Sequence, residues 1–469
     1  MSRGRHRRRR RGRALRAGLA GTALALTAAA TLISTSQAAG GDNPGGLKPL
    51  TSASEIGKLQ LRENLADKST LDTLTNDMGG NVGVRGVLRS ANHTMRNKSA
   101  CDDTERAALP VEPAASRAYC WDSGDATTQK WLPQSVTTSA DADDDGLWGE
   151  DRVILSGWTH NDRKAGEPAQ DKGLARVAFI DANDPDNLKY RWVLLVAPLA
   201  GGKDFGAVRS PVGGMVWYQD KLIVTAQNGA GRDSALYVFD MHRILQANVK
   251  SHAVGKVSGG YSAHGYQYVL PAVGSYSLTG GRCTASDDNG VPCFGSLSLD
   301  RTSTPNSLVA NEWFSSAGSE PARVWRYHFS TALSRTGLLG ANSRGIVNAD
   351  EAYETKAVGL QGVISHKPSG ADKADWYLGQ SPGGRGKHGT LWRQNADDET
   401  GADAARCTAD QSYACWGQHT ESLSYAQPTG ELWTLTASAA NTDGKWEPAA
   451  VPERVLYAVP LSAVNSSMN

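Results

Sequence analysis

Five stretches of the sequence share one order of features: a short β-prone strand, a tight turn, a second strand, a variable loop and a third strand. In the clearest copy, "GGMVWYQDKLIVTA" gives two strands around a turn and "ALYVFD" gives the third. Apolar runs of this length, bounded by Gly, Asp, Asn and Pro, are typical of β-strands. The copies begin about 60–80 residues apart and occupy 147–183, 213–244, 295–329, 360–394 and 421–461.

A unit of three or four antiparallel strands cannot bury both of its faces alone. Placing such units around an axis buries these faces and protects the strand edges. We therefore predict an all-β fold, a β-propeller of 5–7 blades, with a β-sandwich as the alternative. The segment 80–131 is expected to supply one or two further blades, and an N-terminal strand to complete the last blade.

The first 38 residues have the features of a secretory signal. An arginine-rich start precedes an apolar run, 17–33, and then small residues. Ser36 and Ala38 fit the small-x-small rule, so cleavage is predicted after Ala38, with Ala39 as the alternative. No later apolar run reaches the roughly 18 residues that a membrane span needs. We predict a secreted, extracellular protein whose acidic mature chain has neither nucleic acid nor membrane as a partner.

Three regions of different composition follow the signal. The Gly- and Pro-rich segment 39–52 is predicted to be disordered. The segment 53–79 is predicted to form a helical lead-in, because Ser54 suits an N-cap and regularly spaced leucines supply an apolar face. The rest of the chain, 80–469, is predicted to be the propeller domain.

The six cysteines fall into three close pairs. Six cysteines allow 15 connectivities, and nearest-neighbour pairing is the simplest in an exported protein. None of the pairs has the tight C-x-x-C spacing that is typical of a zinc site. We predict three structural disulfides, Cys101–Cys120, Cys283–Cys293 and Cys407–Cys415.

The stretch "DADDDG" resembles the start of a calcium loop. Asp141, Asp143 and Asp145 occupy positions 1, 3 and 5 of such a loop, and Gly146 occupies position 6. The usual closing carboxylate is missing, because position 12 is Arg152. The sequence favours a solvated acidic turn that leads into a strand. Calcium bound by these three aspartates is the alternative, and no other cofactor is expected.

The sequence contains no recognisable catalytic motif. Ser262 and His264 are close, but "GGYSAHGY" lacks the G-x-S-x-G elbow of a hydrolase. The histidines are scattered without a metal-binding spacing, and we interpret them as isolated loop or strand-end residues. Three acidic residues at strand ends, Asp300, Glu312 and Glu421, are the candidates for acid/base chemistry near a propeller axis. Tryptophans recur at equivalent positions of the copies and predict packing between units; they are Trp148, Trp158, Trp217, Trp313, Trp325, Trp376, Trp392 and Trp433.

Four segments, "WLPQSVTTSADA", "GGMVWYQDKLIVTA", "YQYVLPAVGSY" and "ESLSYAQPTGELWTLT", resemble a family of secreted actinobacterial proteins. The resemblance covers about 131–461. The overall design is similar to that of the dispase autolysis-inducing proteins of streptomycetes, a family of secreted β-propellers. That resemblance implies modulation of an extracellular protease and a role as a glutamine donor for an extracellular transglutaminase. Glutamines in expected turns or loops are the candidate donors: Gln129, Gln134, Gln227 and Gln380.

The expected function is that of a secreted, non-enzymatic, monomeric interaction protein whose partner is an extracellular protein such as a protease or a transglutaminase. Propellers present loops from every blade on one rim, which suits binding. The alternative is a propeller hydrolase or lyase that acts on a sugar, a lactone or a phosphate ester in the central channel. A third reading, carbohydrate binding, requires exposed tryptophans.

Overall fold

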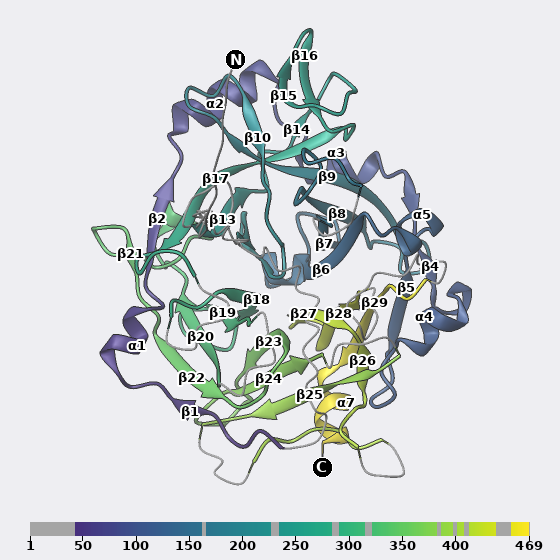
Figure 1. Cartoon of the computed structure of the whole chain (residues 1–469), viewed down its shortest axis with the longest axis vertical. Coiled ribbons are helices and arrows are strands. Elements are labelled where there is room, and N and C mark those ends of the chain that lie inside the picture. Colours follow the sequence, from purple (N-terminus) through teal and green to yellow (C-terminus); the bar gives the residue numbers. More distant parts are fainter. Residues whose placement is uncertain are drawn as a thin grey trace, which may run out of the picture.

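The computed structural model describes residues 43–161, 166–226, 234–283, 290–314, 321–381, 386–396, 401–407, 412–437 and 452–468. The predicted signal segment, 1–38, lies outside these residues. The fold is all-β, as predicted. Short helices lie at its margin (Figure 1): α1 (Ala53–Gly57), α2 (Lys68–Asp77), α3 (Gly83–Arg89), α4 (Asp103–Ala107), α5 (Ser123–Thr127) and α7 (Leu461–Ser467), with 3₁₀ turns at Lys98–Ala100 and Leu333–Arg335. The single helical turn α6 (Ser139–Ala142) is buried instead.

The five copies found in the sequence correspond to five antiparallel groups of strands among the described residues. The first group is β6 (Trp131–Thr138), β7 (Val153–His160), β8 (Ala175–Asp181) and β9 (Lys189–Pro198). The second is β11 (Met215–Tyr218), β12 (Lys221–Thr225), β13 (Ser234–Asp240) and β17 (Tyr268–Leu278). The outer strands β9 and β17 pair in parallel and join these two groups into one large sheet.

The other three groups form separate sheets. They are β18 (Phe294–Asp300), β19 (Ser307–Glu312), β20 (Ala322–His328) and β22 (Glu351–Thr355); β23 (Leu360–His366), β24 (Asp375–Gln380), β25 (His388–Gln394) and β26 (Trp416–Gln418); and β27 (Thr420–Ala426), β28 (Glu431–Thr436), β29 (Val455–Pro460) and β5 (Arg117–Cys120). The N-terminal strand β5 pairs with the C-terminal strand β29. An N-terminal strand thus completes the last group, as predicted.

The first strands of the five groups lie at the centre. They contact one another in the order β6, β11, β18, β23 and β27, and β27 contacts β6. These strands are almost entirely buried. Their approach is close, because a Cβ on Gly214 would lie 2.4 Å from the backbone nitrogen of Leu297. Small residues therefore occupy the positions where the central strands touch.

A belt, residues 43–120, runs around the outside of this ring (Figure 1). Short strands of the belt extend four groups in turn: β1 (Lys48–Pro49) pairs with β22, β2 (Leu61–Leu65) with β17, β3 (His93–Thr94) with β9, and β5 with β29, while β4 (Arg96–Asn97) pairs with β5. The segment 80–131 was expected to form one or two further units. It supplies outer strands to existing groups instead, because its strands are too short to build a sheet alone.

The beginning of the belt differs from the sequence-based expectation. Leu47, in the segment predicted to be disordered, is 4% exposed, and its backbone nitrogen donates to the carbonyl of Asn395. In the predicted helical lead-in, the strand β2 separates α1 from α2. Pairing with β17 overrides the helical pattern of the leucines there.

The remaining strands pair with β9, β17 or β2, or form a separate hairpin. β10 (Phe205–Ala207) pairs with β9, β14 (Leu245–Gln246) with β17, and β21 (Ile346–Val347) with β2, while β15 (Val254–Val257) and β16 (Gly260–Ala263) form a hairpin. No helix of the described residues is long and apolar enough to cross a membrane.

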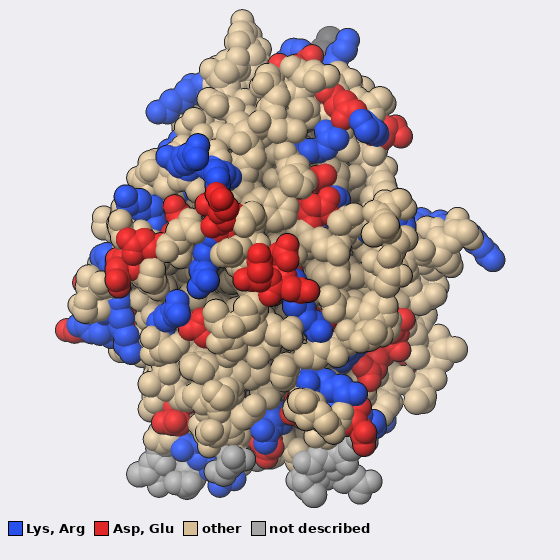
Figure 2. Space-filling model, turned by 180° about the vertical axis from the view of Figure 1, so that it is seen from behind, with Lys and Arg blue, Asp and Glu red and all other residues tan. Residues whose placement is uncertain are grey.

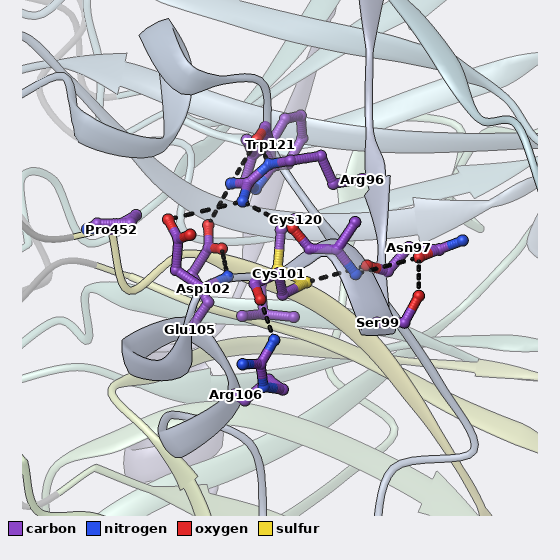
Figure 3. Close-up of a disulfide and its surroundings, with 12 residues drawn as sticks. Arg96, Asn97, Ser99, Cys101, Asp102, Glu105, Arg106, Cys120, Trp121 and Pro452 are labelled. Carbon is purple, nitrogen blue, oxygen red and sulfur yellow. Dashed lines mark hydrogen bonds and ion pairs between the residues drawn. A yellow bond between two sulfur atoms is a disulfide. The ribbon is translucent and has the colours of Figure 1, made fainter.

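Three disulfides have the predicted pairing. Figure 3 shows Cys101–Cys120, which links the part of the belt before α4 to β5, the last strand of the belt. Beside it the guanidinium of Arg96 donates to the carboxylate of Glu105 at 2.7 Å and to the carbonyl of Trp121 at 3.0 Å. Burial raises the pKa of Glu105 above its usual range.

The tryptophans of the copies are buried, as predicted, except for the half-buried Trp148.

A buried ion pair holds the junction between the belt and the first group. The guanidinium of Arg176, on β8, donates to the Asp125 carboxylate of α5 at 2.9 Å. Tyr190 and Trp192 donate to the other oxygen of this carboxylate, at 2.7 and 3.0 Å. The guanidinium also stacks on Trp192 and Trp131, with its carbon 3.5 and 4.1 Å from the ring centres. Each charge is therefore compensated within the core.

We predict that Arg176→Met lowers the free energy of unfolding by about 3–5 kcal/mol, because it removes the guanidinium that is hydrogen-bonded to the buried Asp125 carboxylate. Urea unfolding followed by tryptophan fluorescence measures this change. The matched control is Lys68→Met, which breaks the exposed pair with Asp72 and is expected to cost less than about 1 kcal/mol. Equal effects of the two substitutions would contradict the assignment.

Candidate functional site

A groove lies on the surface between the first group of strands and the group of β27. We call it the side groove. Its floor is apolar, and Tyr119 on β5 stacks with Trp433 on β28 at 6.4 Å between ring centres. Burial raises the pKa of Tyr119 above its usual range. The lining residues are Arg117, Tyr119, Thr138, Ser139, Ala140, Asp145, Gly146, Arg152, Val153, Ile154, Ala182, Pro185, Leu188, Ala426, Pro428, Thr429, Glu431 and Trp433.

The acidic loop 141–152 forms one wall of the side groove, and hydrogen bonds within the loop hold its shape. Thr138 caps the single turn of α6 by accepting from the backbone nitrogen of Ala140 at 3.2 Å. The Ser139 hydroxyl donates to the carbonyl of Gly146 at 2.7 Å and accepts from the backbone of Val153 at 3.1 Å. Gly146 has φ +83°, a conformation that suits glycine.

The structure does not bring Asp141, Asp143 and Asp145 together around a cation. Asp141 is 1% exposed and accepts from the Thr137 and Ser424 hydroxyls at 2.6 and 2.8 Å. Asp143 and Asp145 are exposed, and each accepts from a backbone nitrogen of its own loop. The calcium alternative fails on this geometry, because α6 turns the first carboxylate inward.

The charged lining of the side groove consists of two arginines and two acidic residues, Arg117, Arg152, Asp145 and Glu431. Arg117 forms an ion pair with Glu431 at 2.9 Å. The exposed guanidinium of Arg152 has no ion-pair partner among the described residues. A further hollow continues past Arg152, lined by Arg117, Leu147, Arg152, Ala182, Asn183 and Pro185. An apolar floor beside an unpaired guanidinium suits an apolar side chain next to a carboxylate.

A second hollow adjoins the side groove at Pro428 and is lined by Asp144, Arg301, Asn306, Gln427 and Pro428. Arg301 directly follows β18; it binds the Asp144 carboxylate and donates to the carbonyl of Asp141 at 2.7 Å. These contacts fix the acidic loop to the end of β18.

On the face shown in Figure 2, acidic and basic side chains are interspersed. Recognition on this face therefore depends on local pairs of groups more than on a field of one sign.

The candidate acid/base residues do not form one site. Glu312 is held by Arg323 at 2.5 Å, and burial raises its pKa. Asp300 is held by Arg326 at 2.9 Å and by hydroxyls. Glu421 is 4% exposed, and burial raises its pKa well above the usual range. These carboxylates are absent from the groups of potential metal ligands that meet within 4.8 Å in the described chain.

Ser262 and His264 are not a nucleophile and its base. The Ser262 hydroxyl donates to the carbonyl of Ser251 at 3.0 Å and accepts from the Ser251 hydroxyl at 2.8 Å. The His264 ring contacts the carbonyl of His252 instead, at 3.0 Å. Both side chains thus satisfy the local backbone.

The four candidate glutamines have different environments. Gln134 is 1% exposed on β6, and its amide oxygen accepts from Thr159 and from the backbone of Val212, at 2.5 and 3.0 Å. The prediction that Gln134 lies in a turn is therefore wrong, because the residue belongs to β6. Its buried carboxamide is out of reach of an enzyme. Gln380 lies in β24 and accepts from Trp392 at 2.8 Å. Gln129 is half-buried, and Gln227 lies outside the described residues.

The pKa of Asp141 is raised to about 6 from 3.8, mainly by burial. Because folding favours the protonated form, this residue reduces stability progressively as the pH rises from about 4 to about 6. We predict that Asp141→Asn, measured against wild type, gains roughly 2–3 kcal/mol of stability between pH 4 and pH 7. Urea unfolding at a series of pH values tests this. A pH-independent difference between the two proteins would refute it.

No protein-family model matches the chain, and no curated protein matches it. The resemblance to secreted actinobacterial proteins therefore remains a prediction from the quoted segments.

Proposed function

We propose that the protein is a secreted five-bladed β-propeller that acts as a non-enzymatic binding module for an extracellular protein. The five groups of strands would be the blades, and their mutually contacting first strands would surround the axis. The three disulfides fit an oxidising compartment outside the cytoplasm. Closure through β5 and β29 is the usual way in which a ring of sheets avoids a free edge.

The observation that carries the binding role is the combination of groups in the side groove. Trp433 and Tyr119 form a rigid aromatic floor, and Arg117 and Arg152 lie on the rim. Trp, Tyr and Arg are the residue types most enriched where protein interfaces concentrate their binding energy. Rigid walls from two neighbouring groups keep the entropic cost of binding low.

The occupant that fits is an extended segment of a partner protein with an apolar side chain followed by Asp or Glu. The apolar side chain would lie against Ile154, Leu188 and Trp433, and the carboxylate would bind Arg152. The resemblance stated above makes an extracellular protease the first partner to test, and a transglutaminase the second. Two of the candidate carboxylates form ion pairs with arginines, Glu312 with Arg323 and Asp300 with Arg326. The hydrolase alternative is therefore weaker than the binding role.

We predict that Arg152→Glu weakens partner binding by at least about tenfold, because it places a carboxylate where the partner's carboxylate binds. The immobilised protein is incubated with extracellular medium and, separately, with a display library of short peptides. The matched control is Arg344→Glu, which changes an exposed arginine of the turn before β21.

Support requires a protein or peptide that binds wild type and Arg344→Glu but not Arg152→Glu, and a peptide consensus with an apolar and an acidic residue. Binding that both substitutions leave unchanged would place the interaction elsewhere and overturn the proposal.

A further inference from the structure

Four chemically reactive side chains meet at the outer end of the first group, away from the side groove. His160 is the last residue of β7, Glu167 and Asp171 lie in the loop before β8, and His264 follows β16. His160 Nε2 lies 3.8 Å from a Glu167 oxygen, and His264 Nε2 lies 3.8 Å from Asp171 Oδ1. Ligand atoms of His160, Glu167 and Asp171 all lie within 4.8 Å of one another. All four side chains are largely buried.

The orientation of His264 is fixed by its backbone and by one hydrogen bond. Its φ is +54°, which is uncommon for a residue with a side chain. Its Nδ1 lies 3.0 Å from the carbonyl oxygen of His252, so Nδ1 carries the proton and donates. The lone pair of Nε2 is then directed toward Asp171. A cation between these two acceptor atoms, which lie 3.8 Å apart, would bring them together.

His160 presents a second ring nitrogen to the same place. The residue is 2% exposed, and its Nε2 lies 3.8 Å from a Glu167 oxygen. Its Nδ1 has no hydrogen-bond partner, and neither has the buried Oδ1 of Asp171. Buried polar atoms without partners are costly, and metal coordination by Asp171 would remove that cost for its Oδ1.

We propose that His160, Glu167, Asp171 and His264 bind one divalent transition-metal ion, with zinc preferred. Two imidazole nitrogens and two carboxylate oxygens are a donor set that suits zinc, whereas calcium requires oxygen ligands. Ligands about 2.1 Å from a tetrahedral ion lie about 3.4 Å apart, and the two measured pairs are separated by 3.8 Å. His264 contacts Asp171 but lies outside the group of three that meets within 4.8 Å, so metal binding must draw His264 closer to His160 and Glu167. Four protein ligands leave no open position, so the ion is structural.

The ion would connect two segments that lie far apart in the sequence. Glu167 and Asp171 belong to the loop between β7 and β8, and His264 belongs to the segment after the β15–β16 hairpin. Lys130 forms an ion pair within the cluster, with its Nζ 3.4 Å from a Glu167 oxygen. Its side chain is 59% exposed and can move into solvent when the metal binds. Lys130 therefore lowers the affinity for a cation without blocking it.

The other groups of potential ligands in the described residues are already engaged. Cys101 and Cys120 form a disulfide beside Glu105. Asp125, beside His93 and Asp122, is bound by Arg176, Tyr190 and Trp192. Asp220 and Asp240, beside His242, share Lys221.

The test uses the purified protein after dialysis against a chelator. Zinc binding is measured by calorimetry, and cobalt(II) is added separately, since a tetrahedral site with nitrogen and oxygen ligands gives an intense visible absorption. We expect one ion per chain and a tetrahedral cobalt spectrum. Asp171→Asn and His264→Gln are each expected to weaken zinc binding by at least about tenfold. His328→Gln, which changes a histidine paired with Asp350 elsewhere, is the control and is expected to bind as wild type does.

Each outcome decides the proposal. Absence of zinc binding to wild type, an octahedral cobalt spectrum, or equal zinc affinity of wild type, Asp171→Asn and His264→Gln overturns it. Calcium binding as tight as zinc binding overturns the metal preference and the coordination assigned here. Circular dichroism identifies a variant that does not fold, and in that case the cobalt spectrum and the stoichiometry of wild type decide.

Discussion

Backbone pairing between β5 and β29 is the interaction on which the ring depends, because it joins the two ends of the chain in one sheet. Without it, the last group of strands would have a free edge at β29. The disulfide Cys101–Cys120 fixes β5 from the belt side. On its other side, Asp125 in α5 fixes the junction to Arg176 on β8. A covalent bond and a buried ion pair thus flank the strand that closes the ring.

The sequence predicted those features that depend on local chemistry. The order strand, turn, strand, loop, strand located all five groups, and the spacing of the cysteines predicted their pairing. The belt could not be predicted, because its strands are two to five residues long and form only by pairing with finished groups. Gln134 was misplaced for a related reason: "WLPQSV" contains turn-forming residues, but its position at the centre makes it a fully buried strand.

The site residues were harder to predict than the fold. Asp141, Asp143 and Asp145 had the spacing of a calcium loop, yet a single capped turn of helix directs Asp141 into the core and leaves the other two in solvent. The side groove gave no sequence signal, because its lining comes from five separate segments of the chain. Histidines 104 residues apart meet because β7 and the segment after β16 end at the same edge of the structure. Spacing rules detect only ligands that are local in sequence.

The histidine cluster and the closure junction share aromatic side chains, so they are mechanically connected. The edge of Trp131 contacts the ring of His160 at 5.0 Å, and its face holds the guanidinium of Arg176 at 4.1 Å. Tyr266 also contacts both sides, since it accepts from Arg176 at 3.2 Å and lies 6.3 Å from the ring of His264. An ion that orders His160 and His264 would therefore restrict the two rings that enclose Arg176. Because Arg176 compensates the charge of Asp125, ordering at the cluster would stabilise the junction where the ring closes.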